Sequence, residues 1–461
     1  MGQAVGLPHQ HKMSKAPHLD VKGAVVAVVG MARSGFAAAE LLIALGAHVR
    51  AIDSRVTPEL REKVNQLRID LCPQEDNSFE GVQLVVISPG VPADEEILNR
   101  LRARGIPVIG EVELAGWYLH GPVIGITGSN GKTTTTALTG HILKEAGVPC
   151  QVGGNIGLPP TAMVASSRPD QWNALELSSF QLETIETFRV NVGVVLNVTP
   201  DHLDRHHSFA NYAAAKGQLF AKQHKGDFAV FNADDPFAVE YASITAASPL
   251  WFSLARPVSP GLWFEGNEIR FDGQTLIDAS EIPLRGRHNL ENVMAASAAA
   301  RIAGATLEQI ADAVRSFPGV EHRLQRVKEI NGVTWYNDSK ATNVDATLKA
   351  IEAFPGDIWI ILGGKDKGSD YAPLREPLRK KAHAALLIGA AAAKIAEHLN
   401  GAVPLVPCGT LDCAMDYARG HSSAGDVVLL APACASFDQF DSFEHRGRVF
   451  REIVERIAQA S

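Results

Sequence analysis

The sequence predicts an α/β protein of three domains, each built on a mainly parallel sheet flanked by helices. Its 461 residues exceed what one hydrophobic core usually organises, and at roughly 150 residues per domain they correspond to about three domains. Short β-branched runs alternate with helical patterns, which is typical of parallel sheets covered on both faces, and this alternation restarts twice. We expect domains at residues 1–112, 113–319 and 320–461, with residues 1–20 forming a flexible tail.

The expected elements follow in chain order. The first domain is predicted to contain a helix over residues 36–45 and strands at 24–29, 48–52, 84–87 and 106–109. The central domain is predicted to contain a helix over 133–145 and strands at 123–126, 174–177, 192–196 and 228–231. The third is predicted to end in a helix over 443–460 and to contain strands at 333–336, 358–362, 384–388 and 427–430. We expect Rossmann-like first and third domains and a central domain of the P-loop type.

Composition and charge exclude several classes of protein. With 46% hydrophobic and 20% charged residues, the chain is typical of globular proteins and not of disordered or fibrous ones. The longest uncharged apolar runs, such as 384–393, are shorter than the ~18–20 residues that span a bilayer. Five scattered cysteines form neither a disulfide framework nor a CxxC metal site, which favours the cytoplasm. A net charge of −8 argues against binding to nucleic acid.

A glycine loop between a predicted strand and a predicted helix indicates phosphate binding. Glycines let backbone N–H groups approach an anion, and the following helix directs its positive end at it. Lys132 can reach the β- and γ-phosphates, while a threonine hydroxyl can hold Mg²⁺. The strict pattern would need glycine where Ile126 stands, so a glycine turn capped by threonines is the alternative. We expect ATP and Mg²⁺ at Gly128, Ser129, Asn130, Gly131, Lys132, Thr133 and Thr134.

A second glycine turn follows the first predicted strand. Gly30, Ala32 and Gly35 occupy the places of a dinucleotide GxGxxG motif whose middle glycine is missing, and Asp53 ends the next strand. From these residues alone, NAD, another nucleotide, or helix–sheet packing all remain open. The missing glycine counts against a conventional NAD site.

Acidic, histidine and lysine residues follow the central strands. Because ligand sites lie at the carboxyl ends of parallel strands, Glu176 and His202 are expected near Lys132, where a carboxylate would complete the Mg²⁺ shell. Glu176 could instead be a helix N-terminal carboxylate, and a role for His202 is open. His206 and His207 are expected on the surface. Lys216, in a helix of small residues, could be a solvated lysine.

Four polar loops of the third domain follow or bridge its predicted strands. They lie at residues 321–323, 337–343, 363–368 and 436–439, and together they mix cations, hydroxyls and acids. Such loops could bind an anionic acceptor, close over a nucleotide, or be plain polar loops. No role is assigned to Asp366.

Taken together, these sequence motifs resemble those of the Mur ligases, ATP-dependent enzymes that add amino acids during bacterial cell-wall synthesis. The resemblance covers nearly the whole chain from about residue 21. The glycine loop is shared by a wider superfamily, but the strings at 154–157, 176–183, 337–343 and 432–440 resemble the members that add D-glutamate. The Asp-Asn-Pro-Arg string expected of the diaminopimelate-adding relative is missing.

This resemblance implies a reaction. D-glutamate would be added to UDP-N-acetylmuramoyl-L-alanine through an acyl phosphate and a tetrahedral intermediate, with ATP converted to ADP and phosphate. The resemblance also implies that two Mg²⁺ ions and a CO₂-derived carbamate on Lys216 take part in this reaction. A carbamate would give Mg²⁺ two hard oxygen ligands where an ammonium would repel it. We expect a cytoplasmic monomer that does not insert into membranes.

The resemblance also implies roles for individual residues. The catalytic set would be Lys132, Glu176, His202 and Lys216, and the metal ligands Thr133, Glu176, His202 and carbamylated Lys216. ATP would further contact Asn289, Asn292, Arg323 and Asp338. The uridine nucleotide would bind Arg33, Ser34, Asp53, Ser54, Arg55 and Ser88. The muramoyl and D-glutamate portions would meet Asn155, His322, Lys340, Thr342, Lys367, Ser436 and Phe443.

Overall fold

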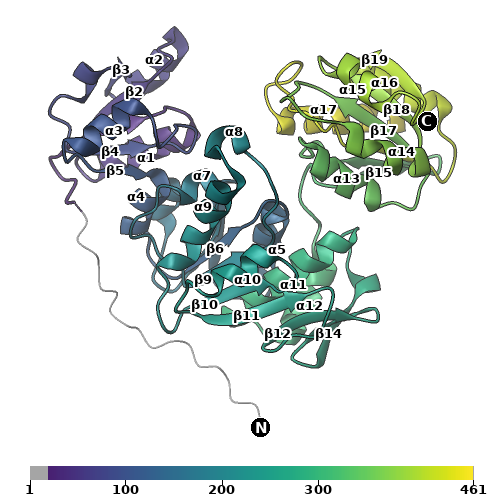
Figure 1. The fold of residues 1–461 in the computed structure, drawn as a ribbon, viewed down its shortest axis with the longest axis horizontal. Helices are drawn as coiled ribbons and strands as arrows, with labels where there is room; N and C mark the ends of the chain where they lie inside the picture. Colours follow the sequence, from purple (N-terminus) through teal and green to yellow (C-terminus); the bar gives the residue numbers. More distant parts are fainter. Residues whose placement is uncertain (1–18, 460–461) are drawn as a thin grey trace. The chain divides into compact units, whose positions relative to one another are not determined.

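A computed structural model describes residues 19–459, and within that range the strands form three sheets (Figure 1). The predicted α/β class is confirmed. The chain divides into two compact units: the described part of Met1–Glu281 with Glu291–Phe317, and Ile282–Leu290 with the described part of Pro318–Ser461. Most of the predicted tail, residues 1–18, lies outside the described residues. No described helix is both long and apolar enough to cross a membrane.

The first sheet is parallel throughout, in the order β3-β2-β1-β4-β5. Its strands are β1 (Val25–Val29), β2 (His48–Asp53), β3 (Asp70–Pro73), β4 (Leu84–Ile87) and β5 (Val108–Gly110). Its helices are α1 (Arg33–Ala44), α2 (Pro58–Gln66), α3 (Glu96–Ala103) and α4 (Glu111–Tyr118). Because β2 and β4 flank β1, the strand order reverses there, which places the Gly30 turn where such sheets bind ligands.

The second sheet has the order β14-β13-β12-β11-β10-β9-β6-β8-β7. Its strands are β6 (Val123–Thr127), β7 (Cys150–Gly154), β8 (Trp172–Glu176), β9 (Val192–Val195), β10 (Phe228–Asn232), β11 (Ser248–Ser253), β12 (Gly261–Glu265), β13 (Glu268–Phe271) and β14 (Gln274–Asp278). Only β12–β13 and β13–β14 pair antiparallel. The strand order reverses around β6, whose carboxyl end carries the glycine loop.

Eight helices in the described residues accompany this sheet. They are α5 (Lys132–Glu145), α6 (Pro160–Met163), α7 (Ser179–Leu182), α8 (Leu203–His206), α9 (Phe209–Ala221), α10 (Pro236–Tyr241), α11 (Arg287–Ile302) and α12 (Leu307–Ser316). Short 3₁₀ turns occur along the chain at Asp76–Phe79, Val164–Ser166, Ala279–Glu281 and Ala372–Leu374.

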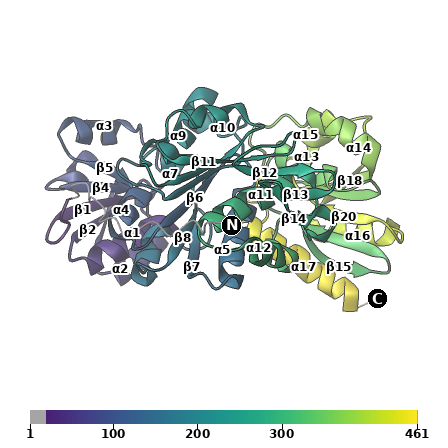
Figure 2. The ribbon, with the colours of Figure 1, turned by 90° about the horizontal axis from the view of Figure 1, so that it is seen from below.

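The third sheet has the order β15-β16-β20-β17-β18-β19, and only β15 is antiparallel to its neighbour. Its strands are β15 (Gln325–Ile330), β16 (Val333–Asn337), β17 (Ile358–Gly363), β18 (Ala382–Ile388), β19 (Leu405–Gly409) and β20 (Val427–Leu430). Helices α13 (Val344–Glu352), α14 (Arg375–Lys381) and α15 (Ala392–Leu399) share one core, and α16 (Leu411–His421) and α17 (Phe443–Gln459) share another. The helices of the two cores lie on opposite faces of the sheet (Figure 2). The successive residues Trp335 and Tyr336 accordingly belong to different cores.

Two buried glutamates at the start of α4 attach the first sheet to the loops of the second. The Glu113 carboxylate accepts hydrogen bonds from the backbone N–H groups of Glu186, Thr187 and Phe188. Glu111 Oε1 accepts from the backbone N–H and hydroxyl of Thr161, at 2.7 and 2.6 Å. Burial raises the pKa of Glu111 to about 7, against the opposing effect of the two Thr161 hydrogen bonds.

Glu111→Gln is expected to flatten the pH dependence of stability. An acid with a raised folded pKa stabilises the fold fully below its ordinary pKa of 4.5, and that contribution is lost as the pH rises through about 7. A shift of this size corresponds to at most about 3 kcal/mol. Urea midpoints measured from pH 5 to pH 8 should therefore fall further for the wild type than for Glu111→Gln. Exposed Glu145→Gln is the matched control, and its urea midpoints should follow those of the wild type. A Glu111→Gln profile parallel to both would contradict the raised pKa of Glu111.

Candidate active site

The glycine loop connects β6 to α5 in a geometry that suits an anion. Gly131, just before α5, has φ +86°, and a Cβ there would lie 2.2 Å from Asn292 Oδ1, so the position requires glycine. Asn197, after β9, holds the loop: its carbonyl accepts from the Ser129 N–H at 2.8 Å and its Oδ1 from the Asn130 N–H at 2.9 Å. The predicted phosphate-loop context of strand, turn and helix N-terminus is confirmed.

Two lysines converge on this loop. Lys132 Nζ donates to the carbonyls of Gly128 and Ser129, at 2.8 and 2.9 Å, and Lys216 Nζ donates to the same Gly128 carbonyl at 2.8 Å. Lys216 is 1% exposed, so the interpretation of a solvated helix lysine is wrong. Burial, and then the charge of Lys132, hold the pKa of Lys216 well below its usual range.

Glu176 ends β8 beside the loop and is 1% exposed. Its Oε1 accepts from Asn155 Nδ2 at 2.9 Å, and its carbonyl accepts from the Asn155 N–H at 2.8 Å. Helix α7 begins only at Ser179, with Ser178 as its capping residue, so the alternative of a helix N-terminal carboxylate at Glu176 is wrong. A Cβ on Gly154 would lie 2.2 Å from the Glu176 carbonyl oxygen, which explains the glycine before Asn155.

The three histidines after β9 have different environments. His202 precedes α8 with φ +51°; its ring lies edge-on to Phe180 at 4.8 Å, and its Nε2 lies 3.6 Å from an Asp201 oxygen. The expectation of a surface position is wrong for His206, which is buried, stacks on Phe180 and lies 2.9 Å from the Ser179 hydroxyl. His207 is exposed as expected.

The residues around the loop fit a nucleoside triphosphate with Mg²⁺. Thr133 and Thr134 are buried in the first turn of α5, and within residues 19–459 the buried Thr134 Oγ1 has no hydrogen-bond partner. Hydroxyl and carboxylate oxygens are the hard donors that Mg²⁺ prefers, and Glu176 supplies the carboxylate. Lys132 offers a cationic partner for phosphate.

The two asparagines of α11 differ in their contacts. Asn292 Oδ1 lies beside Gly131 and 3.3 Å from Thr135 Oγ1, next to the phosphate loop. Asn289, in the first turn of α11, donates from Nδ2 to the Arg285 carbonyl at 2.5 Å. A nucleotide contact by Asn289 stays a prediction.

The glycine turn after β1 is tied to the ends of β2 and β4. Asp53 Oδ2 accepts from the Met31 N–H at 2.7 Å, and the Ser88 hydroxyl donates to the Gly30 carbonyl at 2.6 Å. A Cβ on Gly35 would lie 2.0 Å from that carbonyl oxygen, so helix–turn packing alone requires this glycine. The Arg33 guanidinium donates to the Gly157 carbonyl. Ser34 lies in the first turn of α1, and Ser54 and Arg55 directly follow β2.

In the second unit, a buried acid lies next to basic side chains after β16. Burial raises the pKa of Asp338 to about 6, opposed first by the charge of Arg323 and also by Lys340. Arg323 Nε is buried, with no hydrogen-bond partner in the described part of the chain. His322 is buried, and its Nδ1 accepts from Asn337 Nδ2 at 3.0 Å. These groups could contact an anionic ligand at the carboxyl edge of the third sheet.

Arg446, which the sequence does not single out, holds two of the predicted substrate loops together. This fully buried guanidinium donates to the Ser339 hydroxyl and carbonyl at 2.9 and 2.8 Å and to the Cys434 carbonyl at 3.2 Å. The loops bearing Lys340 and Ser436 are thereby fixed, and Lys340 Nζ lies 5.5 Å from the centre of the Phe443 ring.

A third loop joins the other two. The Lys365 N–H donates to the Ala435 carbonyl at 2.8 Å, next to Ser436, which brings the loop that carries exposed Lys367 to the same edge of the sheet. Thr342 belongs to the loop after β16, where its N–H donates to the Lys340 carbonyl. Asp366 pairs with Lys394 at 2.9 Å and accepts from the Tyr371 hydroxyl at 2.8 Å.

Three family models match successive parts of the chain. They are the Mur ligase MurD-like N-terminal domain at residues 24–110, the Mur ligase middle domain at 126–300, and the Mur ligase, glutamate ligase domain at 322–434. The chain is 61% identical over 436 residues to the UDP-N-acetylmuramoylalanine–D-glutamate ligase of Solibacter usitatus, covering 95% of this chain and 98% of that protein. It is 52% identical over 447 residues to the ligase of the same name from Acidobacterium capsulatum, covering 95% and 97%.

Solved structures share the fold at lower identity. UDP-N-acetylmuramate-alanine ligase MurC from Thermotoga maritima matches with a TM-score of 0.60 at 18% identity, covering 95% of this chain and 99% of that chain. The MurF ligase from the same organism, in complex with ADP, also matches with a TM-score of 0.60, at 19% identity, covering 95% and 97%. With relatives of this identity aligned over nearly its whole length, the chain belongs to the Mur ligase family.

Proposed function

We propose that this chain is an ATP-dependent ligase that joins D-glutamate to UDP-N-acetylmuramoyl-L-alanine in peptidoglycan precursor synthesis. The observation that carries the proposal is the convergence of Lys132 and Lys216 on the Gly128 carbonyl, in a loop that fits a triphosphate. The names of the relatives supply the choice of D-glutamate and of the nucleotide sugar.

The reaction must join two anions before it forms an amide. The alanyl carboxylate would attack the γ-phosphate of ATP, breaking its bond to ADP and giving an acyl phosphate. The amine of D-glutamate would attack the acyl carbon, and the tetrahedral intermediate would collapse to amide and phosphate. Lys132, which lies at the phosphate loop, would offset the negative charge that gathers as the carboxylate approaches the triphosphate. Mg²⁺, held by Thr133 and Glu176 with His202 and carbamylated Lys216, would add to this charge neutralisation.

Lys216 suits carbamylation because its burial favours the neutral form of the amine. The nitrogen lone pair would form a bond to the carbon of CO₂, and the amine would release a proton to give a carbamate anion. A protonated ammonium has no lone pair to donate, so the lowered pKa of Lys216 favours this step. The product would replace a cation by an anion with two oxygen ligands.

The other two domains would bind the substrates that meet ATP. The carboxyl edge of the first sheet, with Arg33, Asp53 and Ser88, would hold the uridine nucleotide. The loops fixed by Arg446 would hold D-glutamate through Lys340, Thr342, Lys367, Ser436 and Phe443, with His322 and Asn155 as further contacts to the substrates. Arg323 and Asp338 would contact ATP. We place the domain boundaries near residues 112 and 319, and infer a cytoplasmic monomer.

Phosphate release with a panel of amino acids tests the proposed function. With ATP, Mg²⁺ and UDP-N-acetylmuramoyl-L-alanine, we expect release that depends strictly on D-glutamate, and little with L-glutamate, L-lysine or diaminopimelate. Release without an acceptor amine would instead indicate a nucleotide switch. Preference for another amino acid would indicate a sister ligase.

Lys216→Ala is expected to lose nearly all ligation, by at least about 10³-fold in kcat, because a charged contact made in the reacting complex is removed. Ligation is measured as product formation, and ¹³C-labelled bicarbonate should give a carbamate carbon signal in the wild type that this variant lacks. Exposed Lys222→Ala, one residue beyond α9, is the matched control and should keep both properties. Near-normal turnover of folded Lys216→Ala would refute the role.

Substitutions in the third-domain loops should act chiefly on D-glutamate. Ser436→Ala and Lys367→Ala each remove one contact to an anionic amino acid, which is expected to raise its apparent KM by about tenfold or more. The KM for ATP should change little. Initial rates over a D-glutamate series provide the test, with exposed Lys380→Ala in the same domain as the control. An effect confined to the ATP KM would reassign the loops to the nucleotide.

A further inference from the structure

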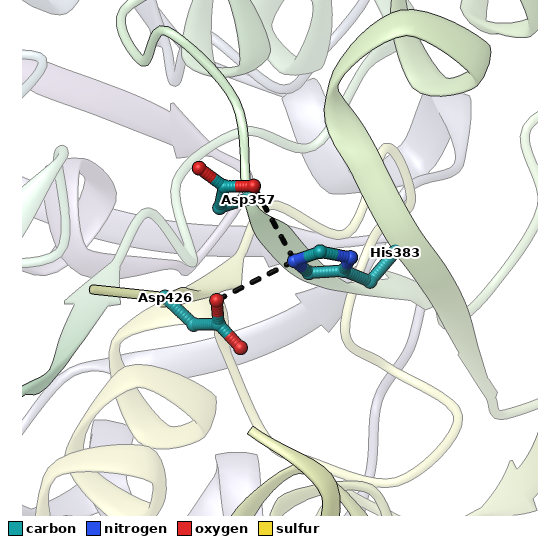
Figure 3. Close-up of side chains that lie close together, drawn as sticks. All are labelled: Asp357, His383 and Asp426. Carbon is teal, nitrogen blue, oxygen red and sulfur yellow. Dashed lines mark ion pairs between the residues drawn. The ribbon is translucent and has the colours of Figure 1, made fainter. Parts of the chain in front are cut away.

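Three side chains that can bind metals lie together at the amino ends of three neighbouring strands (Figure 3). Asp357 and Asp426 directly precede β17 and β20, whose first residues are paired in the parallel register. In β18 the pairing skips one residue, because Ile358 pairs with Ala382 and Trp359 with Ala384. His383 is therefore the extra residue of a bulge, a feature that can redirect a side chain.

The spacing of the three side chains suits one small cation. His383 Nε2 lies 3.5 Å from Asp357 Oδ1 and 3.4 Å from Asp426 Oδ1, and all three ligand atoms lie within 4.8 Å of one another (Figure 3). Bonds of about 2.1 Å in a tetrahedral shell place neighbouring ligand atoms roughly 3.4 Å apart. The two nitrogen–oxygen separations are close to that value without any rearrangement.

The ligand side chains are themselves held by neighbouring groups. Asp426 Oδ2 accepts hydrogen bonds from the Trp359 indole N–H at 3.0 Å and from the Ser423 N–H at 2.9 Å. These bonds orient the carboxylate so that Oδ1 faces His383. The His383 ring packs on Trp359, with ring centres 5.5 Å apart. Outer partners that orient carboxylate and imidazole ligands in this way support metal binding.

This cluster is separate from the residues assigned to the ligase reaction. Most of those residues in the third domain follow the carboxyl ends of β16, β17 and β20, and His322 and Arg323 precede the antiparallel β15 at the same edge, where Gln325 pairs with Asn337. The cluster lies at the amino ends of β17, β18 and β20. Strand β17 contains six residues, so its two ends are roughly 20 Å apart. The ligase reaction therefore gives no account of this arrangement.

We propose that Asp357, His383 and Asp426 bind a divalent transition metal ion of the zinc class, which ties together the starts of β17, β18 and β20. One imidazole nitrogen with two carboxylate oxygens favours Zn²⁺, Co²⁺ or Ni²⁺, whereas Mg²⁺ and Ca²⁺ take oxygen ligands. Asp357 is 69% exposed and His383 43% exposed, so water has access to complete the shell. The ion's role is structural, because a ligand that binds only the folded state stabilises it.

Metal titration of the full chain tests this site. Protein freed of metal by a chelator is titrated with Zn²⁺ by calorimetry and with Co²⁺ by visible absorption, in excess Mg²⁺ so that the proposed nucleotide site does not contribute. The test variants are His383→Gln and Asp357→Asn. The matched control is His421→Gln. His421 is an exposed histidine near the same tryptophan, and its Nδ1 is hydrogen-bonded to the Tyr417 carbonyl.

The wild type and His421→Gln should bind one more equivalent of metal than either test variant, or bind it at least about tenfold more tightly. Zn²⁺ should raise the thermal midpoint of the first two proteins only. Equal metal stoichiometry and equal affinity in all four proteins would overturn the proposed metal site. His383 would then only form ion pairs with the two carboxylates. Loss of metal binding in His383→Gln but not in Asp357→Asn would also overturn the proposed site. Ligation activity, expected to be unchanged, shows that the variants fold.

Discussion

Two amines share one carbonyl oxygen in the glycine loop, and the chemistry of the central domain depends on this constraint. Lys132 and Lys216 each place Nζ 2.8 Å from the Gly128 oxygen. Two ammonium groups this close repel each other, and burial removes the water that would screen Lys216. The repulsion is relieved when Lys216 is neutral or when anions approach. A neutral amine can react with CO₂, and a bound triphosphate supplies the anions. The same placement of two amines therefore favours both the carbamylation of Lys216 and the binding of a triphosphate in the proposed chemistry.

The parallel sheets determine where such constraints can arise. In a parallel sheet all carboxyl ends lie on the same edge, so loops far apart in sequence meet there. Asp53 and Ser88 meet at the Gly30 turn in this way, and Asn197 holds the glycine loop from the adjacent strand. The amino edge obeys the same rule: β17, β18 and β20 bring Asp357, His383 and Asp426 together. Register thus accounts for both the proposed reaction site and the proposed metal site.

Strands and loops were predictable where local composition determines them, and burial of single polar residues was not. The β-branched runs at 84–87 and 427–430 form β4 and β20 with those bounds. The strands that were not predicted are β3, β7, β11, β12, β13, β14, β15 and β19. Among them, β7, β13 and β15 contain polar, half-exposed residues that resemble loops. His206 and Arg446 give no local signal, since neighbouring residues do not show whether a histidine or a helix arginine is buried, and arginine is mostly exposed. Their burial depends on distant partners, Phe180 for one and the Cys434 carbonyl for the other.

Cations held at defined positions also explain how a chain of net charge −8 can serve substrates that are all anions. Net charge describes the averaged surface, whereas a ligand responds to charges nearby in a medium of low dielectric constant. Arg446 illustrates this point: burial lowers its pKa to about 10, which leaves it protonated near neutral pH. Its guanidinium donates hydrogen bonds to the backbone carbonyls of Ser339 and Cys434, which fixes the loops around Lys340. The positive charge that binds substrate is therefore set by how a few buried groups are held, and overall composition gives no measure of it.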